Sequence, residues 1–236
     1  IERLKQNNVS IVYISHRMDE IFRISDRITV IRDGEYIGTK ATSETNADEL
    51  VSMMVGRKLE NYYTRTYSAT EQEVLRVENL SKQDEFDNVN FVVNKGEILG
   101  FFGLVGAGRS EIMTALFGAT GFDTGTVYLD GKEIKVKNPH KAIDNGIAMV
   151  PEDRKKKGLV LENTLSFNIT LASLKSVIDR VLISNRKKDQ TARKFMDDLS
   201  IKAPSPDAFA SSLSGGNQQK VVLGKWLSTK PRLLIL

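Results

Sequence analysis

Residues 103 to 110 have the types and spacing of a loop that binds phosphate. They read GLVGAGRS, and the three glycines let successive backbone amides turn toward one anion. An apolar run, residues 98–102, precedes the loop and predicts a buried strand. A helical pattern with Ile112, Ala115 and Leu116 on one face follows it. Strand, glycine loop and helix in this order place a phosphate at the positive end of the helix; a purely structural glycine turn is the alternative.

Two side chains of this loop bear on charge and metal binding. Ser110 stands where the pattern G-x-x-x-x-G-K-[ST] has the hydroxyl that binds Mg²⁺, and Arg109 replaces the lysine of that pattern. Arginine keeps the positive charge, but its guanidinium is planar and larger than an ammonium group. We therefore predict nucleotide binding with slowed hydrolysis. The residues predicted to bind nucleotide here are Gly103, Gly106, Ala107, Gly108, Arg109, Ser110 and Glu111.

A second glycine motif, LSGGNQQ at residues 213–219, comes about a hundred residues later, directly before a helical pattern. Ser214 is a good candidate to cap that helix, and Gly215 and Gly216 let its backbone approach an anion closely. The alternative is a serine–glycine loop that caps the helix and binds nothing. With Asn217, these residues form the second predicted part of a nucleotide site.

Two further polar residues, Glu152 and His16, each follow an apolar run and are candidate site residues. Glu152 follows an apolar run in AMVPEDR, and a carboxylate there could bind Mg²⁺; the alternative is an exposed acidic loop. His16 follows Ser15 at the end of the apolar run of residues 9–14, which predicts another buried strand. A structural histidine is the alternative for His16. We assign no role to His140.

The composition is that of a globular protein rather than a disordered or membrane-spanning one. The chain has 236 residues, of which 40% are hydrophobic and 27% charged. Its apolar runs are too short to span a bilayer. The absence of cysteine excludes disulfides and thiolate metal sites and fits a reducing compartment. The net charge of +4 is mild, so the basic runs 154–157 and 186–188 are expected to be solvated, with nucleic-acid or lipid contact as the alternative.

The patterns divide the chain into three parts: a domain at residues 1–56, a polar linker at 57–73 and a second domain at 74–236. In the first, we expect a helix around residues 19–24, a hairpin with strands 27–32 and 35–39, and a helix through Ala47 and Met54. In the second, we expect strands at 74–77, 89–93, 98–102, 126–129 and 132–134, then mainly helices from 139 onward. Both ends look cut, so we expect a piece of a longer protein. The fold class expected is α/β.

The motifs together resemble the ATP-binding subunit of ribose-, galactose- or xylose-type importers of the ATP-binding cassette (ABC) family. The resemblance rests on Ser15-His16, Val55-Gly56-Arg57, the arginine-containing glycine loop, Pro151-Glu152-Asp153-Arg154 and LSGGN. Within one cassette the glycine loop comes first and the histidine last. Because His16 precedes Gly103 here, the resemblance implies the end of one cassette followed by most of a second.

The resemblance further implies a P-loop NTPase fold with a mixed core sheet, an antiparallel β subdomain and a helical subdomain. It implies ATP and Mg²⁺ as cofactors, with Ser110 and Glu152 as metal ligands, the latter at a position where the family has glutamine. Ser214 to Asn217 and the catalytic His16 would belong to the competent site of the first cassette, whereas Arg109 and Ser110 would hold nucleotide at a degenerate second site. The piece alone, lacking the catalytic carboxylates, would bind nucleotide weakly and hydrolyse none.

The implied function is an ATPase that drives sugar import from the cytoplasmic face of the plasma membrane, as a peripheral subunit. Its partners would be transmembrane permease subunits and, indirectly, a sugar-binding protein, with no nucleic acid. The sugar itself does not follow from the sequence. A soluble twin-cassette ATPase of ribosomes is the alternative, although residues 57–73 are short and irregular where such proteins have a long charged helix. A purely regulatory nucleotide-binding module is a third possibility.

Overall fold

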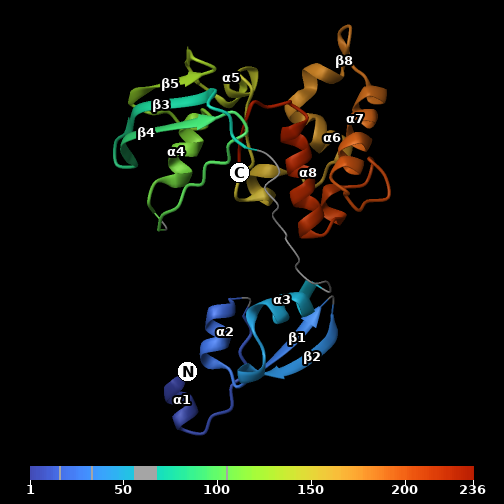
Figure 1. Ribbon diagram of the computed structural model, residues 1–236. Helices are drawn as coiled ribbons and strands as arrows, with labels where there is room; N and C mark the ends of the chain where they lie inside the picture. The colour runs from blue at the N-terminus through green and yellow to red at the C-terminus, as the bar shows by residue number, and fades with distance from the viewer. Residues whose placement is uncertain (16, 33, 56–67, 105) are drawn as a thin grey trace. The chain divides into compact units, whose positions relative to one another are not determined.

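The computed structural model describes residues 1–15, 17–32, 34–55, 68–104 and 106–236. The chain forms two compact units, Ile1–Thr66 and Tyr67–Leu236 (Figure 1). His16, Asp33, Gly56 and most of the expected linker lie outside the described residues. No helix in the described ranges combines the length and apolar character that crossing a membrane requires.

The first unit is an antiparallel hairpin covered by helices. The two strands pair from Arg27 opposite Ala41 to Arg32 opposite Glu35, which confirms the predicted hairpin. Ile28, Val30 and Leu50 are buried between the hairpin and the helix that follows it. The elements are α1 (Glu2–Gln6), α2 (Met18–Ile24), β1 (Arg27–Arg32), β2 (Glu35–Ala41), the 3₁₀ turn η1 (Thr42–Glu44) and α3 (Ala47–Val55).

The second unit begins with a four-stranded antiparallel sheet in the order β4-β3-β5-β6. Leu75, Val77, Leu80 and Val127 of this sheet are buried in one core cluster with residues of α4. Figure 1 shows α4 beside the sheet. The predicted strands at 74–77, 89–93, 126–129 and 132–134 are confirmed, and the first three are longer than predicted. The elements are β3 (Glu73–Lys82), β4 (Phe86–Asn94), α4 (Arg109–Leu116), β5 (Thr124–Leu129), β6 (Lys132–Ile134) and α5 (Pro139–Asp144).

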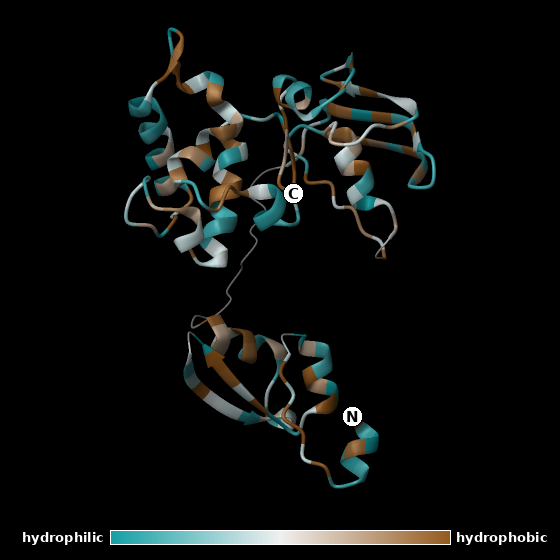
Figure 2. Ribbon diagram, turned by 180° about the vertical axis from the view of Figure 1, so that it is seen from behind, coloured by the Kyte–Doolittle hydropathy of each residue, from teal (hydrophilic) through white to brown (hydrophobic). Residues whose placement is uncertain are grey.

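The helical part follows a short strand, β7 (Ile147–Met149), which pairs in parallel with the last strand, β10 (Leu233–Ile235). Figure 2 shows brown, apolar ribbon where α6 and α8 face one another, and Ile169, Val221 and Val222 are fully buried there. The Trp226 and Phe117 rings meet edge to face at 5.3 Å and join the helices to the end of α4. The elements are η2 (Arg154–Gly158), α6 (Leu165–Thr170), η3 (Leu171–Val177), β8 (Ile178–Asp179), β9 (Leu182–Ile183), α7 (Asn185–Asp198), η4 (Ala210–Ser212) and α8 (Gly215–Leu227).

Two predicted strands are wrong. Residues 9–14 and 98–102 have no strand structure, and Val12, Ile14 and Ile98 are more than nine-tenths exposed. An apolar run becomes a strand only where neighbouring strands accept its backbone hydrogen bonds and cover its side chains. No strand among the described residues pairs with either segment. The mixed core sheet is therefore represented by the parallel pair of β7 and β10.

Lys225 on α8 is buried, and we therefore expect the free energy of unfolding to depend on pH. Burial lowers its pKa from 10.5 to about 8, and its Nζ donates to the Gly158 carbonyl at 2.5 Å. Between these pH values the unfolded chain binds more protons than the folded chain, so the free energy of unfolding should rise with pH, by about 3 kcal/mol in all. Urea titrations from pH 7 to 10.5 should show this rise in the wild type and not in Lys225→Met. Parallel profiles would contradict the assignment.

Candidate nucleotide-binding site

The glycine loop leads directly into α4, as the sequence predicts. Gly106 and Gly108 have φ angles of +85° and +81°, which glycine adopts without strain, and Gly108 is the N-cap of the helix. A methyl group on Gly108 would lie 2.9 Å from the Glu85 carbonyl oxygen. The start of α4 therefore packs directly against the turn between β3 and β4, and a side chain at position 108 would push it away.

The charged and polar residues of the loop lie in the first turn of α4. Arg109, Ser110 and Glu111 are its first three residues, and Ser110 is exposed while Arg109 is half-buried. Among the hydrogen bonds and ion pairs of the described residues, none involves the Arg109 guanidinium or the Ser110 hydroxyl. The helix N-terminus thus presents a cation and a hydroxyl beside unpaired backbone amides, an arrangement suited to an anion.

The second glycine motif begins α8, as predicted. Ser214 is the N-cap, but its hydroxyl makes no capping bond to the backbone. It accepts instead from Asn217 Nδ2 at 3.1 Å, and Asn217 Oδ1 accepts from the Lys202 amide at 2.9 Å. Gly215 and Gly216 are exposed, so the amides of the first turn remain accessible to a ligand.

Glu152 lies on an exposed stretch just after β7. The next residue, Asp153, caps η2 by accepting from the amides of Lys156 and Lys155, both at 3.0 Å. These bonds, that to Lys156 first, lower the pKa of Asp153. Arg154, which the sequence places in a solvated basic run, instead reaches Gln218 on α8. Sequence reasoning missed this contact, because a run of four basic residues does not indicate which of them packs against a distant helix.

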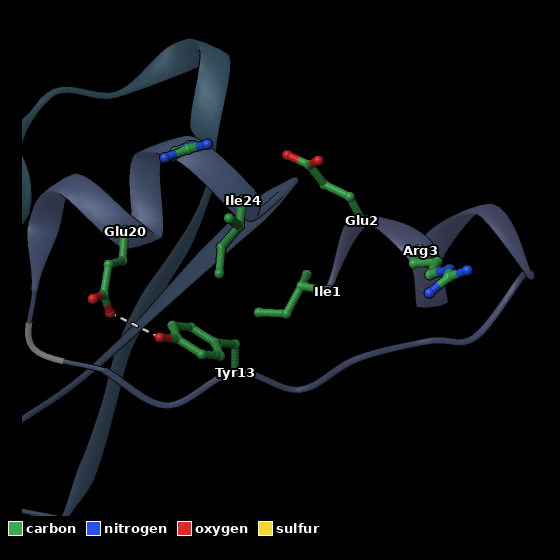
Figure 3. Close-up of a pocket in the computed structure, with 7 residues that line it drawn as sticks. Ile1, Glu2, Arg3, Tyr13, Glu20 and Ile24 are labelled. Carbon is green, nitrogen blue, oxygen red and sulfur yellow. Dashed lines mark hydrogen bonds between the residues drawn. The ribbon is translucent and has the colours of Figure 1, made fainter.

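The residues around position 16 converge on Glu20 of α2. Tyr13 Oη donates to Glu20 Oε2 at 2.8 Å, which Figure 3 shows beside a pocket between the first two helices. Ser15 Oγ donates to the same oxygen at 3.3 Å, and the Arg17 guanidinium lies 2.5 Å from Glu20 Oε1. The bond to the carboxylate raises the pKa of Tyr13. The side chains of residues on both sides of position 16 thus contact Glu20 of α2, while His16 itself lies outside the described residues.

The two glycine motifs belong to different parts of the second unit. Figures 1 and 2 show α4 with the antiparallel sheet and α8 among the helices. The glycine loop contacts the β3–β4 turn, whereas the 214–217 loop contacts the segment after Glu152. Within the described residues, no group of three or more acidic, histidine or cysteine side chains gathers to hold a metal.

A family model described as ABC transporter matches residues 86–236. The chain belongs to this family, and its α/β fold class is that of an ABC cassette. The nucleotide-free ATP-binding cassette of an ABC transporter aligns with a TM-score of 0.57 at 26% identity, over 69% of this chain and 67% of that one. The ADP form of the cassette MJ1267 aligns with a TM-score of 0.52 at 29% identity, over the same shares.

The ribose import ATP-binding protein RbsA of Geobacillus kaustophilus strain HTA426 is 50% identical over all 236 residues of this chain. The protein of the same name from Bacillus subtilis strain 168 is 45% identical over the same length. In both, the matched part is 48% of the relative. The chain thus spans about half the length of the curated relatives that it matches.

Proposed function

We propose that this chain is part of the ATP-binding subunit of a bacterial ribose importer. Residues 1–56 would be the end of one ABC cassette, 57–73 a linker and 74–236 most of a second cassette. The observation that carries the proposal is the pair of glycine loops, each at the accessible start of a helix in one compact unit. The relatives named as ribose import proteins support the sugar.

In the second cassette, the amides from Gly106 to Ser110 would surround the phosphates of ATP. Ser110 and Glu152 would be the protein ligands of Mg²⁺. A small protein donor set fits this ion, which usually takes its other ligands from phosphate and water. Arg109 would bind the phosphates less closely than lysine, so this site would retain ATP rather than hydrolyse it rapidly.

The 214–217 loop would act in the other site, on ATP bound to the first cassette. The first turn of its helix is accessible and lies in a different part of the unit from the loop of residues 103–110, which suits a loop that acts across an interface. His16 would contact the γ-phosphate in that same site. Closing of the cassettes around ATP and their separation after hydrolysis would move permease subunits at the cytoplasmic face of the membrane, to which a sugar-binding protein delivers ribose.

Replacing Gly108 by alanine in the full-length protein should remove one of two nucleotide sites. The methyl group would meet the Glu85 carbonyl and displace the phosphate loop. Equilibrium dialysis with radiolabelled ATP should give about two ATP bound per wild-type protein and about one per variant, because the amides of the loop no longer converge on one anion.

The matched control is Gly131→Ala, which has a similar φ of +73° and open space around the position, far from the loop in sequence. It should bind as the wild type does. An unchanged stoichiometry in Gly108→Ala would refute the role of the loop, and a wild-type protein that binds no ATP would refute the proposed function.

A further inference from the structure

Arg154 lies against the first turn of α8, although the two are far apart in sequence. Its Nε donates to Gln218 Oε1 at 3.5 Å, at the long end of hydrogen bonding. A methyl group on Gly215 would lie 2.8 Å from Arg154 Nη2. Gln218 is itself buried, and its Nε2 donates to the Ala210 carbonyl at 3.1 Å. The guanidinium therefore occupies the space beside Gly215 that a side chain there would need.

The remainder of η2 is also attached to α8. Lys225 Nζ donates to the Gly158 carbonyl, and a methyl group on Gly158 would lie 3.0 Å from Val222 Cγ2. Arg154 and Gly158 are the first and last residues of η2. Because both ends of this short segment contact the same helix, η2 and α8 are packed as one piece.

The charge of Arg154 makes this placement unusual for a purely structural contact. The guanidinium lies beside the N-terminus of α8, which carries a partial positive charge. None of the ion pairs formed by the described residues includes Arg154, and Lys155, Lys156 and Lys157 follow it in sequence. Like charges placed together are favourable where an anion binds between or beside them.

We propose that Arg154 is a positioning residue for the 214–217 loop. It holds the first turn of α8 so that the Gly215 and Gly216 amides and the Ser214 hydroxyl face a phosphate. The inference rests on the proposed function, which identifies that phosphate as part of ATP bound to the other cassette. It also means that Glu152, two residues before Arg154, and the loop move together, so that each nucleotide site affects the other.

The test uses full-length protein carrying Arg154→Ala, Arg154→Lys or, as matched control, Lys155→Ala. Hydrogen exchange of the Gln218 amide, which donates to the Ser214 carbonyl at 2.9 Å, should become at least about tenfold faster in Arg154→Ala, because the first turn of α8 loses its contact with the guanidinium. The kcat of ATP hydrolysis should fall by about tenfold or more while the affinity for ATP stays the same, because the loop contacts nucleotide only in the closed state. Arg154→Lys should be intermediate, since it keeps the charge but not both contacts, and Lys155→Ala should match the wild type.

Unchanged exchange of the Gln218 amide in Arg154→Ala would overturn the proposal. So would a loss of kcat accompanied by equal losses of ATP affinity and thermal stability, which indicates a merely structural contact. A wild-type protein that hydrolyses no ATP would instead refute the proposed function, and the exchange measurement would still decide whether Arg154 orders the turn.

Discussion

Replacing Gly125 by alanine is expected to lower the free energy of unfolding of the second unit by at least about 3 kcal/mol. Gly125 lies in β5, and its φ is +108°, which strains any residue with a side chain. A methyl group there would lie 2.5 Å from Leu80 Cα and 2.7 Å from the Asn79 carbonyl oxygen. Both atoms belong to β3, so the paired strands would have to separate at this point.

Urea unfolding of the purified chain, followed by the fluorescence of Trp226, measures this effect. Trp226 is the chain's one tryptophan and lies in the second unit. Gly131→Ala separates the two causes, because Gly131 has a positive φ but nothing near its side-chain position, and it should cost about 1 kcal/mol. If Gly125→Ala costs no more than this control, the approach of β3 to β5 can relax and the steric argument fails.

The sequence predicts best the elements whose signals are local. The hairpin of β1 and β2 and the helix that starts after Ser214 each follow from turn residues, caps and periodicity within a few positions. The glycine loop is similar, because its positive φ angles and the following helix are properties of neighbouring residues. These local features contain nearly all the candidate site residues, which explains why a site could be predicted without a structure.

What the sequence does not predict depends on distant partners. Residues 98–102 are as apolar as a buried strand, but an apolar run does not specify which strands pair with it. Arg154 is one of four consecutive basic residues and is distinguished only by its contacts on α8, 64 positions away. Asn168 has an ordinary polar side chain within a helix, and its importance becomes evident only from the backbone that folds around it.

Asn168 is the second position where a large effect is expected. Its side chain is fully buried in α6. Its Oδ1 accepts from the Val160 amide at 2.8 Å, and its Nδ2 donates to the carbonyls of Val160 at 2.9 Å and Thr164 at 3.0 Å. It thus satisfies the backbone of the segment that directly follows η2 and connects it to α6.

Asn168→Leu should lower the free energy of unfolding by about 3 kcal/mol, because a side chain of similar size removes three hydrogen bonds and leaves the Val160 amide without its partner. The two carbonyls lose one bond each but keep the backbone amides of Asn163 and Asn168. Urea unfolding measures the loss. Asn145→Leu is the control, since that side chain makes one hydrogen bond, to the Lys141 carbonyl at the surface, and it should cost less than about 1 kcal/mol. Equal costs for the two variants would show that water or a local shift replaces the bonds of Asn168.

Asn168→Asp tests the same hydrogen bonds through pH. A carboxylate could still accept from the Val160 amide but would face two carbonyl oxygens, so burial and repulsion should raise its pKa above the unfolded value. A raised carboxyl pKa means that the folded chain binds more protons, and stability should therefore fall as pH increases through the range between the two values. At low pH the protonated carboxyl can donate to a carbonyl, and the variant should approach the wild type. A variant whose deficit is the same at pH 4 and pH 8 would show that the two carbonyls do not depend on a donor from position 168.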